Sequence, residues 1–137
     1  MDILSLARSV FSADRYATEV TGVGIEYVGD HEARCLLPIE RHHCNARDVV
    51  MGGVLFTLAD FSAAVAANTD CLTEGDLQWV SLDSTVHFLA PATGKRLVSS
   101  TSALKTGRST ALYQTIIENP DDGKRVAVVE TTMVRIK

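Results

Sequence analysis

One stretch of the chain, MGGVLFTLADFSAAVAAN from Met51 to Asn68, is almost entirely apolar and carries a single ionisable residue, Asp60. A helix with one solvated side would show several charged residues on that side. Burial of a lone carboxylate costs free energy unless the group is paired, hydrogen-bonded or used in chemistry. We therefore expect a buried helix over residues 52–68 in which Asp60 has a specific role.

Both faces of this helix are apolar or small when its residues are placed at about 100° intervals. One face carries four large apolar residues, Val54, Leu58, Phe61 and Val65. The opposite face carries Asp60, flanked by Phe56, Ala63, Ala64 and Ala67. Because one sheet covers only one face of a helix, the simplest cover for the Asp60 face is a second copy of the chain. We expect a homo-oligomer, either a homodimer or a homotetramer.

The start of the helix has its own chemical character. The first backbone N–H groups of a helix have no intrahelical partner and carry partial positive charge. Gly52 and Gly53 lack a Cβ, so another group can approach the backbone closely at this point. Such amides are suited to bind a carbonyl oxygen on which negative charge develops, as in acyl transfer or enolate chemistry.

The spacing between these groups restricts how they can cooperate. From Gly52 to Asp60 the helix rises about 12 Å at 1.5 Å per residue, so one carbonyl cannot contact both groups of the same helix. Either the two groups serve different purposes, or a site combines Gly52 of one chain with Asp60 of another.

Composition excludes several other classes of protein. A chain of 137 residues with 46% hydrophobic and 22% charged residues is typical of one globular domain. The net charge of −4 gives no basic footprint for nucleic acid. The three cysteines, Cys35, Cys44 and Cys71, show no paired spacing, which favours reduced thiols and a cytoplasmic location.

The N-terminus and the apolar stretch do not indicate export or a membrane span. Residues 1–17 lack a basic segment and have the spacing of a short amphipathic helix rather than a signal peptide. Residues 49–68 are long enough to span a bilayer, but a central Asp costs roughly 3 kcal/mol of insertion free energy. We expect no membrane partner.

The remaining residues predict strands. Residues 20–28 and 32–39 form two strands around the Gly29–Asp30 turn, and four long strands follow the helix. In QWVSLDSTVHFLAP, alternation places Val80, Leu82, Val86 and Phe88 on one face, and Ser81, Asp83, Thr85 and His87 on the other. An antiparallel sheet with one helix buried against it is an α+β layer.

Several short motifs of this chain together resemble those of a known family. The motif N-x5-MGG-VLFTLAD, with Asn45, Gly52, Gly53 and Asp60, resembles the hotdog-fold acyl-CoA thioesterases of the phenylacetate-degradation type. The segments VSLDSTVHFLAPATG and KTGRS follow in the same order, so the resemblance covers about residues 20–137. It implies a single hotdog domain, a long central helix wrapped by a roughly six-stranded antiparallel sheet, with sites at dimer interfaces.

The resemblance also implies a role for each matched residue. Gly52 would supply the amide for the thioester oxygen, and Asp60 of the partner chain would be the nucleophile or the general base toward water. Asn45 and Ser81 would position the thioester or the water, and Gly53 would allow the substrate to approach. The turn with Lys105, Gly107, Arg108 and Ser109 would bind the nucleotide end of coenzyme A, a place suited to cations. No cofactor beyond the coenzyme A of the substrate is implied.

The sequence departs from the family pattern at two positions. The family reads His-Gly-Gly where this chain has Met51-Gly52-Gly53, and it has glycine at the position of Asp48. The missing histidine places the catalytic rate in question, and His42 or His43 are the nearby candidates to replace it. His42, His43 and Cys44 have no second ligand pair at zinc spacing, so we expect no metal.

Other readings stay open. A dehydratase or hydratase of the same fold would need His and Glu, but those positions fall on Cys44 and Leu58. A protein that binds acyl-CoA without cleaving it is favoured by Met51 and disfavoured by the retained Asp60. Neither the acyl group nor the choice between nucleophile and base is fixed, and Phe56, Phe61 and Trp79 are expected in the pocket wall.

Overall fold

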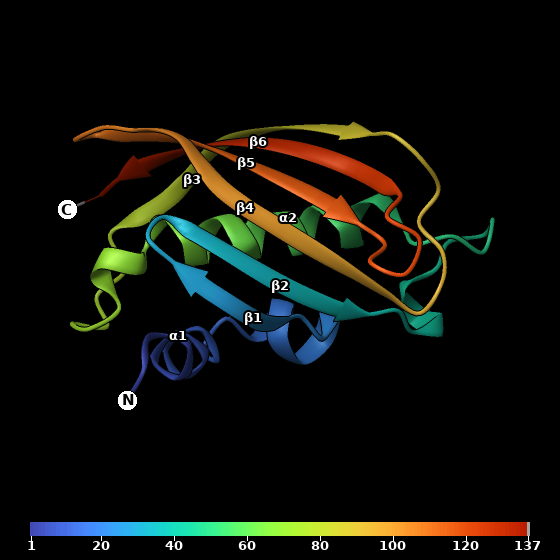
Figure 1. The fold of residues 1–137 in the computed structure, drawn as a ribbon, viewed down its shortest axis with the longest axis horizontal. Coiled ribbons are helices and arrows are strands. Elements are labelled where there is room, and N and C mark those ends of the chain that lie inside the picture. Colours follow the sequence, from blue (N-terminus) through green and yellow to red (C-terminus); the bar gives the residue numbers. More distant parts are fainter. Residues whose placement is uncertain (137) are drawn as a thin grey trace.

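The computed structural model describes residues 1–136, which form one antiparallel sheet wrapped around one long helix (Figure 1). The sheet order is β1-β2-β4-β5-β6-β3, and every neighbouring pair is antiparallel. The strands are β1 (Gly24–Gly29), β2 (Glu32–Pro38), β3 (Trp79–Phe88), β4 (Arg96–Thr106), β5 (Thr110–Glu118) and β6 (Arg125–Arg135). The expected α+β architecture and the six-stranded sheet are confirmed.

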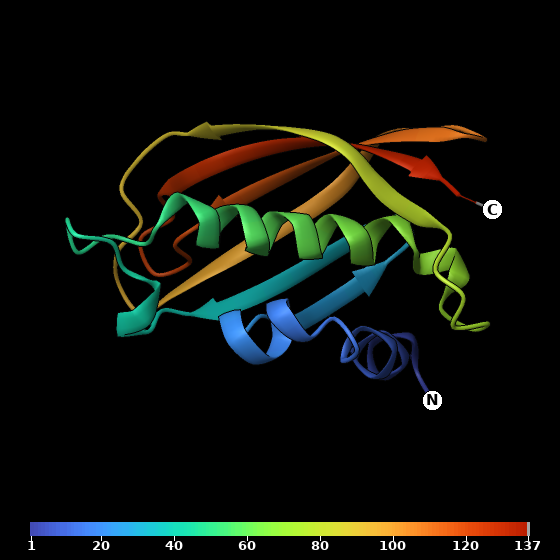
Figure 2. The same ribbon diagram turned by 180° about the vertical axis from the view of Figure 1, so that it is seen from behind.

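The long helix α2 (Gly52–Ala67) lies along the inner face of the sheet (Figure 2). Its large side chains Leu58, Phe61 and Val65 are all buried, whereas Phe56 is exposed. Alternate residues of β2, β4, β5 and β6 complete the core from the other side, because successive strand side chains point to opposite faces. The helix ends one residue earlier than expected, with Asn68 as its C-cap.

The N-terminal segment differs from the single helix expected over residues 1–17. Helix α1 (Ile3–Phe11) ends at a turn, and a short π-helix, η1 (Tyr16–Thr21), follows where a strand was expected to begin. The turn brings Phe11 against Phe61 of α2, with ring centroids 5.7 Å apart and edge-to-face geometry. The segment from Asp14 to Ala17 also borders Phe56 and Asp60 of α2, so the chain's own N-terminal segment lies beside part of the helix face expected to meet a partner (Figure 2).

Strand β3 is an edge strand, and its register corrects the predicted faces. The register shifts between Ser81, which pairs with Met133, and Asp83, which pairs with Thr132. This bulge at Leu82 reverses the alternation, so Ser81 shares the helix-facing side with Val86 and Phe88. The prediction that Ser81 lies on the face of Asp83 was wrong, because a bulge cannot be read from alternation.

The loop between β2 and α2 is ordered by its own hydrogen bonds. It contains a 3-10 turn, η2 (Arg41–His43), and leads back to the helix through Asp48. Asp48 has a φ of 62°, in the left-handed region that glycine adopts most easily. This backbone geometry suits the glycine that the family resemblance implies at that position.

No helix in the described part of the chain is both long enough and apolar enough to cross a membrane.

Candidate active site

Asp60 lies near the middle of α2 and is partly exposed. The Ser81 hydroxyl donates a hydrogen bond to Asp60 Oδ1 at 2.9 Å. The same hydroxyl oxygen is 3.5 Å from the Met133 sulfur. Within residues 1–136, no donor is found for Asp60 Oδ2. One oxygen of the carboxylate is thus oriented by β3, and the other is left to accept a proton or attack an electrophile.

The start of α2 forms the second half of the candidate site. Gly52 is the first helical residue, and no acceptor for its amide is found among the described residues. It borders a hollow of about 450 Å³ with apolar walls from Val50, Leu55, Phe88 and Pro91. A Cβ on Gly52 would lie 3.0 Å from the Phe88 ring, so the missing side chain leaves room for that ring. An acyl carbonyl can approach a free amide here in apolar surroundings.

Met51 precedes the helix and supplies no side-chain cap. Its methyl group lies 2.8 Å from where a Cβ on Gly53 would be, so the Met51 side chain folds over Gly53. An apolar thioether therefore covers part of the helix start, at the position where the family resemblance implies a polar imidazole.

Asn45 is engaged in the loop rather than directed at Asp60. Its Oδ1 accepts hydrogen bonds from the Arg47 amide at 2.9 Å and from the Val49 amide at 3.4 Å. These bonds hold the turn that leads into α2, and they leave the Asn45 Nδ2 group as the donor for a ligand.

His43 cannot replace the missing family histidine. It is 3% exposed, and both ring nitrogens are occupied: Nδ1 accepts from the Glu40 amide at 2.9 Å, and Nε2 donates to the Thr21 carbonyl at 2.7 Å. The ring thus joins the loop to η1 as a structural element. His42 stacks beside it with ring centroids 4.2 Å apart and is exposed.

The predicted coenzyme A residues lie at the β4–β5 turn. Lys105, Gly107, Arg108 and Ser109 are all exposed, and Lys105 and Gly107 border a hollow of about 420 Å³. Thr106 pairs with Ala111, Ala111 with Met133, and Met133 with Ser81. Three strand spacings of about 4.8 Å therefore separate the turn from Ser81, or about 14 Å in all. The structure therefore does not bring this turn together with Asp60, because the turn lies about 14 Å from Ser81, the hydrogen-bond partner of Asp60.

A second hollow next to Asp60 contains residues that sequence reasoning missed. It measures about 230 Å³ and lies between α2 and the segment that joins α1 to η1. Helix α2 contributes Phe56, Thr57, Asp60 and Phe61, and the N-terminal segment contributes Asp14, Tyr16 and Ala17. Phe56 and Phe61 line this hollow as expected. Trp79 does not, because it is buried under the Arg135 guanidinium, 5.0 Å from the ring centroid. No local signal in residues 14–17 indicates this contact, which depends on the turn after Phe11.

One cluster of metal-ligating side chains lies elsewhere. His31 Nε2 is 3.3 Å from Asp70 Oδ2 and 3.7 Å from Asp30 Oδ1, beyond the C-terminal end of α2. Its Nδ1 is hydrogen-bonded to the buried Tyr113 hydroxyl at 2.9 Å. Burial and the charges of Asp70 and Asp30 raise the pKa of Tyr113 to about 12. The two carboxylates are largely exposed, and the cluster ties the β1–β2 turn to the residues after α2.

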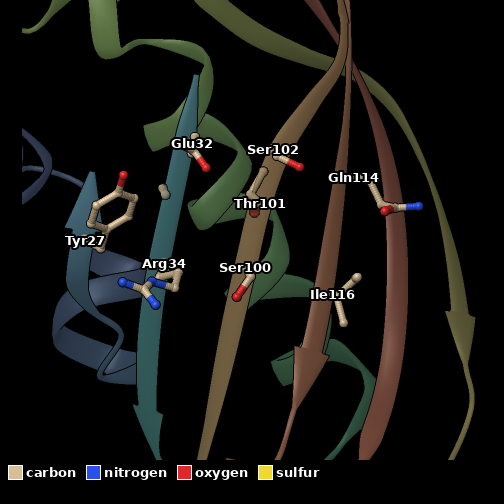
Figure 3. Close-up of a pocket in the computed structure, with 9 residues that line it drawn as sticks. Tyr27, Glu32, Arg34, Ser100, Thr101, Ser102, Gln114 and Ile116 are labelled. Atoms are coloured by element: carbon tan, nitrogen blue, oxygen red, sulfur yellow. The ribbon is translucent and has the colours of Figure 1, made fainter. Parts of the chain in front are cut away.

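The outer face of the sheet carries a shallow hollow of about 170 Å³ (Figure 3). Short polar side chains of β4 line it with Gln114 and Ile116 of β5, together with Arg34, whose guanidinium lies 4.7 Å from the centroid of the Tyr27 ring. These residues do not form a nucleophile–base pair, so the Asp60 region remains the candidate active site.

Comparison with known proteins agrees with this fold. A Haemophilus influenzae thioesterase superposes with a TM-score of 0.86 at 23% identity, over 100% of this chain and 92% of that one. The PaaI protein of the Escherichia coli phenylacetic acid degradation operon gives 0.84 at 24% identity, over 99% and 97%. A hypothetical thioesterase from Streptococcus pneumoniae, solved with coenzyme A, gives 0.79 at 20% identity, over 91% and 95%. These likenesses confirm the hotdog fold.

Two curated relatives carry the name "Putative esterase". The Archaeoglobus fulgidus protein is 29% identical over 104 residues, 76% of this chain, and this chain spans only 64% of its length. The Deinococcus radiodurans protein is 27% identical over 130 residues, which is 94% of this chain and 85% of that protein. Both names support a hydrolase.

A model of the family described as the thioesterase superfamily matches residues 48–134. The match includes the start of α2, Asp60, Ser81 and the β4–β5 turn. On this evidence the chain is a member of the thioesterase superfamily.

Proposed function

We propose that this protein hydrolyses an acyl-CoA thioester at a site shared by two copies of the chain. The observation that carries the proposal is the Asp60 carboxylate, held by Ser81 at 2.9 Å on an otherwise apolar helix. A site that only bound acyl groups would gain nothing from a carboxylate among these apolar side chains. Family membership supplies the reaction class, and the coenzyme A in the S. pneumoniae structure supports the substrate.

Asp60 activates the attack on the thioester in one of two ways. As a general base, Asp60 Oδ2 takes a proton from water, and the resulting hydroxide attacks the carbonyl carbon. As a nucleophile, it attacks that carbon directly and forms a mixed anhydride that water then cleaves. In both routes the C–S bond breaks, and coenzyme A leaves as a thiolate that acquires a proton. A single turnover in ¹⁸O-labelled water tests the anhydride route: label found in Asp60 requires a mixed anhydride that water cleaves at the Asp60 carboxyl carbon.

The Gly52 amide of the second copy stabilises the oxyanion. One such donor is worth roughly 10²- to 10³-fold in rate. The β3 edge supports the required pairing, because it leaves backbone groups unpaired along ten residues and exposes Val80, Leu82 and Phe88. Pairing of two β3 edges would extend the sheet and cover the exposed side of α2. The same proposal gives a homodimer or a dimer of dimers in the cytoplasm.

The experiment is free-thiol release from short, long and aryl acyl-CoAs by the wild type and by Asp60→Asn. General-base or nucleophilic help of roughly 10²- to 10⁴-fold should disappear in the variant. Asp83→Asn, which neutralises an exposed carboxylate on the outer side of β3, is the matched control. Hydrolysis that survives in Asp60→Asn would refute this assignment.

A second candidate function is acyl-CoA binding without hydrolysis. The Met51 side chain over Gly53 favours it, because no polar group stands at the helix start. Acyl-CoA binding by the wild type without any thiol release would support this second function, and release would exclude it.

A further inference from the structure

Two aspartates line the same small hollow beside the candidate site. Asp14, from the turn before η1, and Asp60, from α2, both line the 230 Å³ hollow. None of its seven lining residues is a cation, and Arg15, which follows Asp14 in sequence, is not among them. The hollow is therefore negatively charged on both its helix side and its N-terminal side.

The position of the hollow makes it the place for the acyl group. In Figure 2 the open strip of α2 lies between β3 and the N-terminal segment. Ser81 contacts Asp60 from β3, while the hollow is bounded by the N-terminal segment. A carbonyl carbon within reach of Asp60 therefore has the hollow on the side away from Ser81.

The walls limit both the size and the charge of what can enter. Phe61 and Ala17 are 2% and 4% exposed, so they close the floor against a long chain. Phe56 and Tyr16 add aromatic surface at 37% and 64% exposure. A carboxylate placed among these rings would lose hydration, find no cation among the lining residues of its own chain, and meet two like charges.

We propose that Asp14 is a specificity-determining residue that restricts the substrate to compact, uncharged acyl groups and rejects acyl groups with a terminal carboxylate. This inference rests on the proposed function for the position of the thioester. Asp14 lies outside the segment that the family model matches, so the selection is a property of this chain's N-terminal segment.

The test compares succinyl-CoA with 4-methylpentanoyl-CoA, whose isopropyl end has the shape of the carboxylate without its charge. For each variant, kcat/KM for 4-methylpentanoyl-CoA is divided by kcat/KM for succinyl-CoA. This ratio is unaffected by a change that slows both substrates equally. We expect the wild type to prefer the neutral acyl group at least about tenfold, and Asp14→Asn to narrow that ratio by about fivefold. Glu19→Gln removes a carboxylate from the same segment but outside the hollow, so its ratio should stay within about twofold of the wild type.

Binding of uncleavable analogues, in which a methylene replaces the thioester sulfur, separates the two proposals. If no substrate is hydrolysed but Asp14→Asn still narrows the ratio of binding constants, the hydrolase assignment fails and the selection stands. If hydrolysis occurs but Asp14→Asn behaves like Glu19→Gln, the selection fails and the hydrolase assignment stands. Failure of both analogues to bind, with no hydrolysis, would overturn both.

Discussion

The two ends of α2 are built in opposite ways. At the C-terminal end, Asn68 is 1% exposed and makes four hydrogen bonds: Nδ2 donates to the Ala64 and Trp79 carbonyls, and Oδ1 accepts from the Gln78 and Trp79 amides. At the N-terminal end, Met51 offers no cap, and the Gly52 amide faces an apolar hollow. One end satisfies its backbone and fixes the helix to β3, and the other keeps a donor free for a ligand.

This difference separates stability from activity along one helix. We call the C-terminal end, around Asn68, the sealed end. Loss of a hydrogen-bonding side chain there should lower the free energy of unfolding and leave thioester hydrolysis intact. We call the N-terminal end, around Gly52, the open end. Loss of a donor there should slow thioester hydrolysis and leave the free energy of unfolding nearly unchanged.

Of the changes at the two ends of α2, removal of the Gly52 amide should have the largest effect. Met51 has φ −63° and ψ 141°, which suits a residue before proline, and proline is tolerated at the first helical position. Gly52→Pro therefore deletes the N–H while the helix is kept. We expect kcat for thioester hydrolysis to fall by roughly 10²- to 10³-fold.

Gly52→Ala is the matched control, because it adds a similar Cβ near Phe88 but keeps the amide. The Phe88 ring is 58% exposed and can move aside. If Gly52→Ala lost as much activity as Gly52→Pro, crowding rather than the missing donor would be the cause.

At the sealed end, Asn68→Ala should cost about 3 kcal/mol of unfolding free energy, since buried backbone groups would lose their partners. Urea denaturation measures this loss. Asn119→Ala is the reference variant for this loss of unfolding free energy. The Asn119 side chain donates to the Thr93 carbonyl and accepts from the Asp121 amide, so it makes two hydrogen bonds instead of four. A loss below that of Asn119→Ala would contradict the role given to Asn68.

A pH effect should mark the Tyr113–His31 contact near the same end. Because the pKa of Tyr113 is raised to about 12, its stabilising contribution is complete below about pH 10 and is lost as the pH rises toward 12. Tyr113→Phe should cost about 1 kcal/mol at neutral pH, the worth of one hydrogen bond.

The same variant should lose less stability than the wild type between pH 9 and pH 11. Burial also raises the pKa of Cys35 to about 11, so both proteins weaken in alkali, and only their difference reports on Tyr113. Parallel urea midpoints for the two proteins across this range would show that Tyr113 does not titrate as described.

The smallest effect is expected at Asp48, on the loop before the open end. Relief of its left-handed backbone in Asp48→Gly should stabilise the protein by less than about 1 kcal/mol, because glycine also adds entropy to the unfolded chain. Asp48→Ala should destabilise by a similar amount, since alanine adopts this conformation less readily than aspartate. Thermal melts of both variants would measure the difference, and equal melting temperatures would argue against strain at this position.

The sequence predicted the parts of the fold that depend on local pattern. The single carboxylate in an apolar run identified α2 and Asp60, and period-2 strands indicated the antiparallel sheet. The ordered motifs identified the family, which the family model confirms.

The parts that depend on long-range geometry were missed. The bulge at Leu82 turns Ser81 toward Asp60, and alternation alone assigned Ser81 to the wrong face. The hydrogen bonds of His43 to Glu40 and Thr21 removed a candidate that was plausible by proximity in sequence. Asp14 reaches the hollow only because Phe11 packs on Phe61, a contact between distant segments.

The most direct test of the shared site is complementation between two inactive variants. Asp60→Asn and Gly52→Pro are unfolded together, mixed in equal amounts and refolded, and thiol release from acyl-CoA is compared with each variant alone. If Gly52 of one copy serves Asp60 of the other, each mixed dimer contains one intact site, and activity should return to about a quarter of the wild-type level for random pairing. Activity that stays at the level of the separate variants, with mixed dimers present by native mass spectrometry, would contradict a site shared between chains.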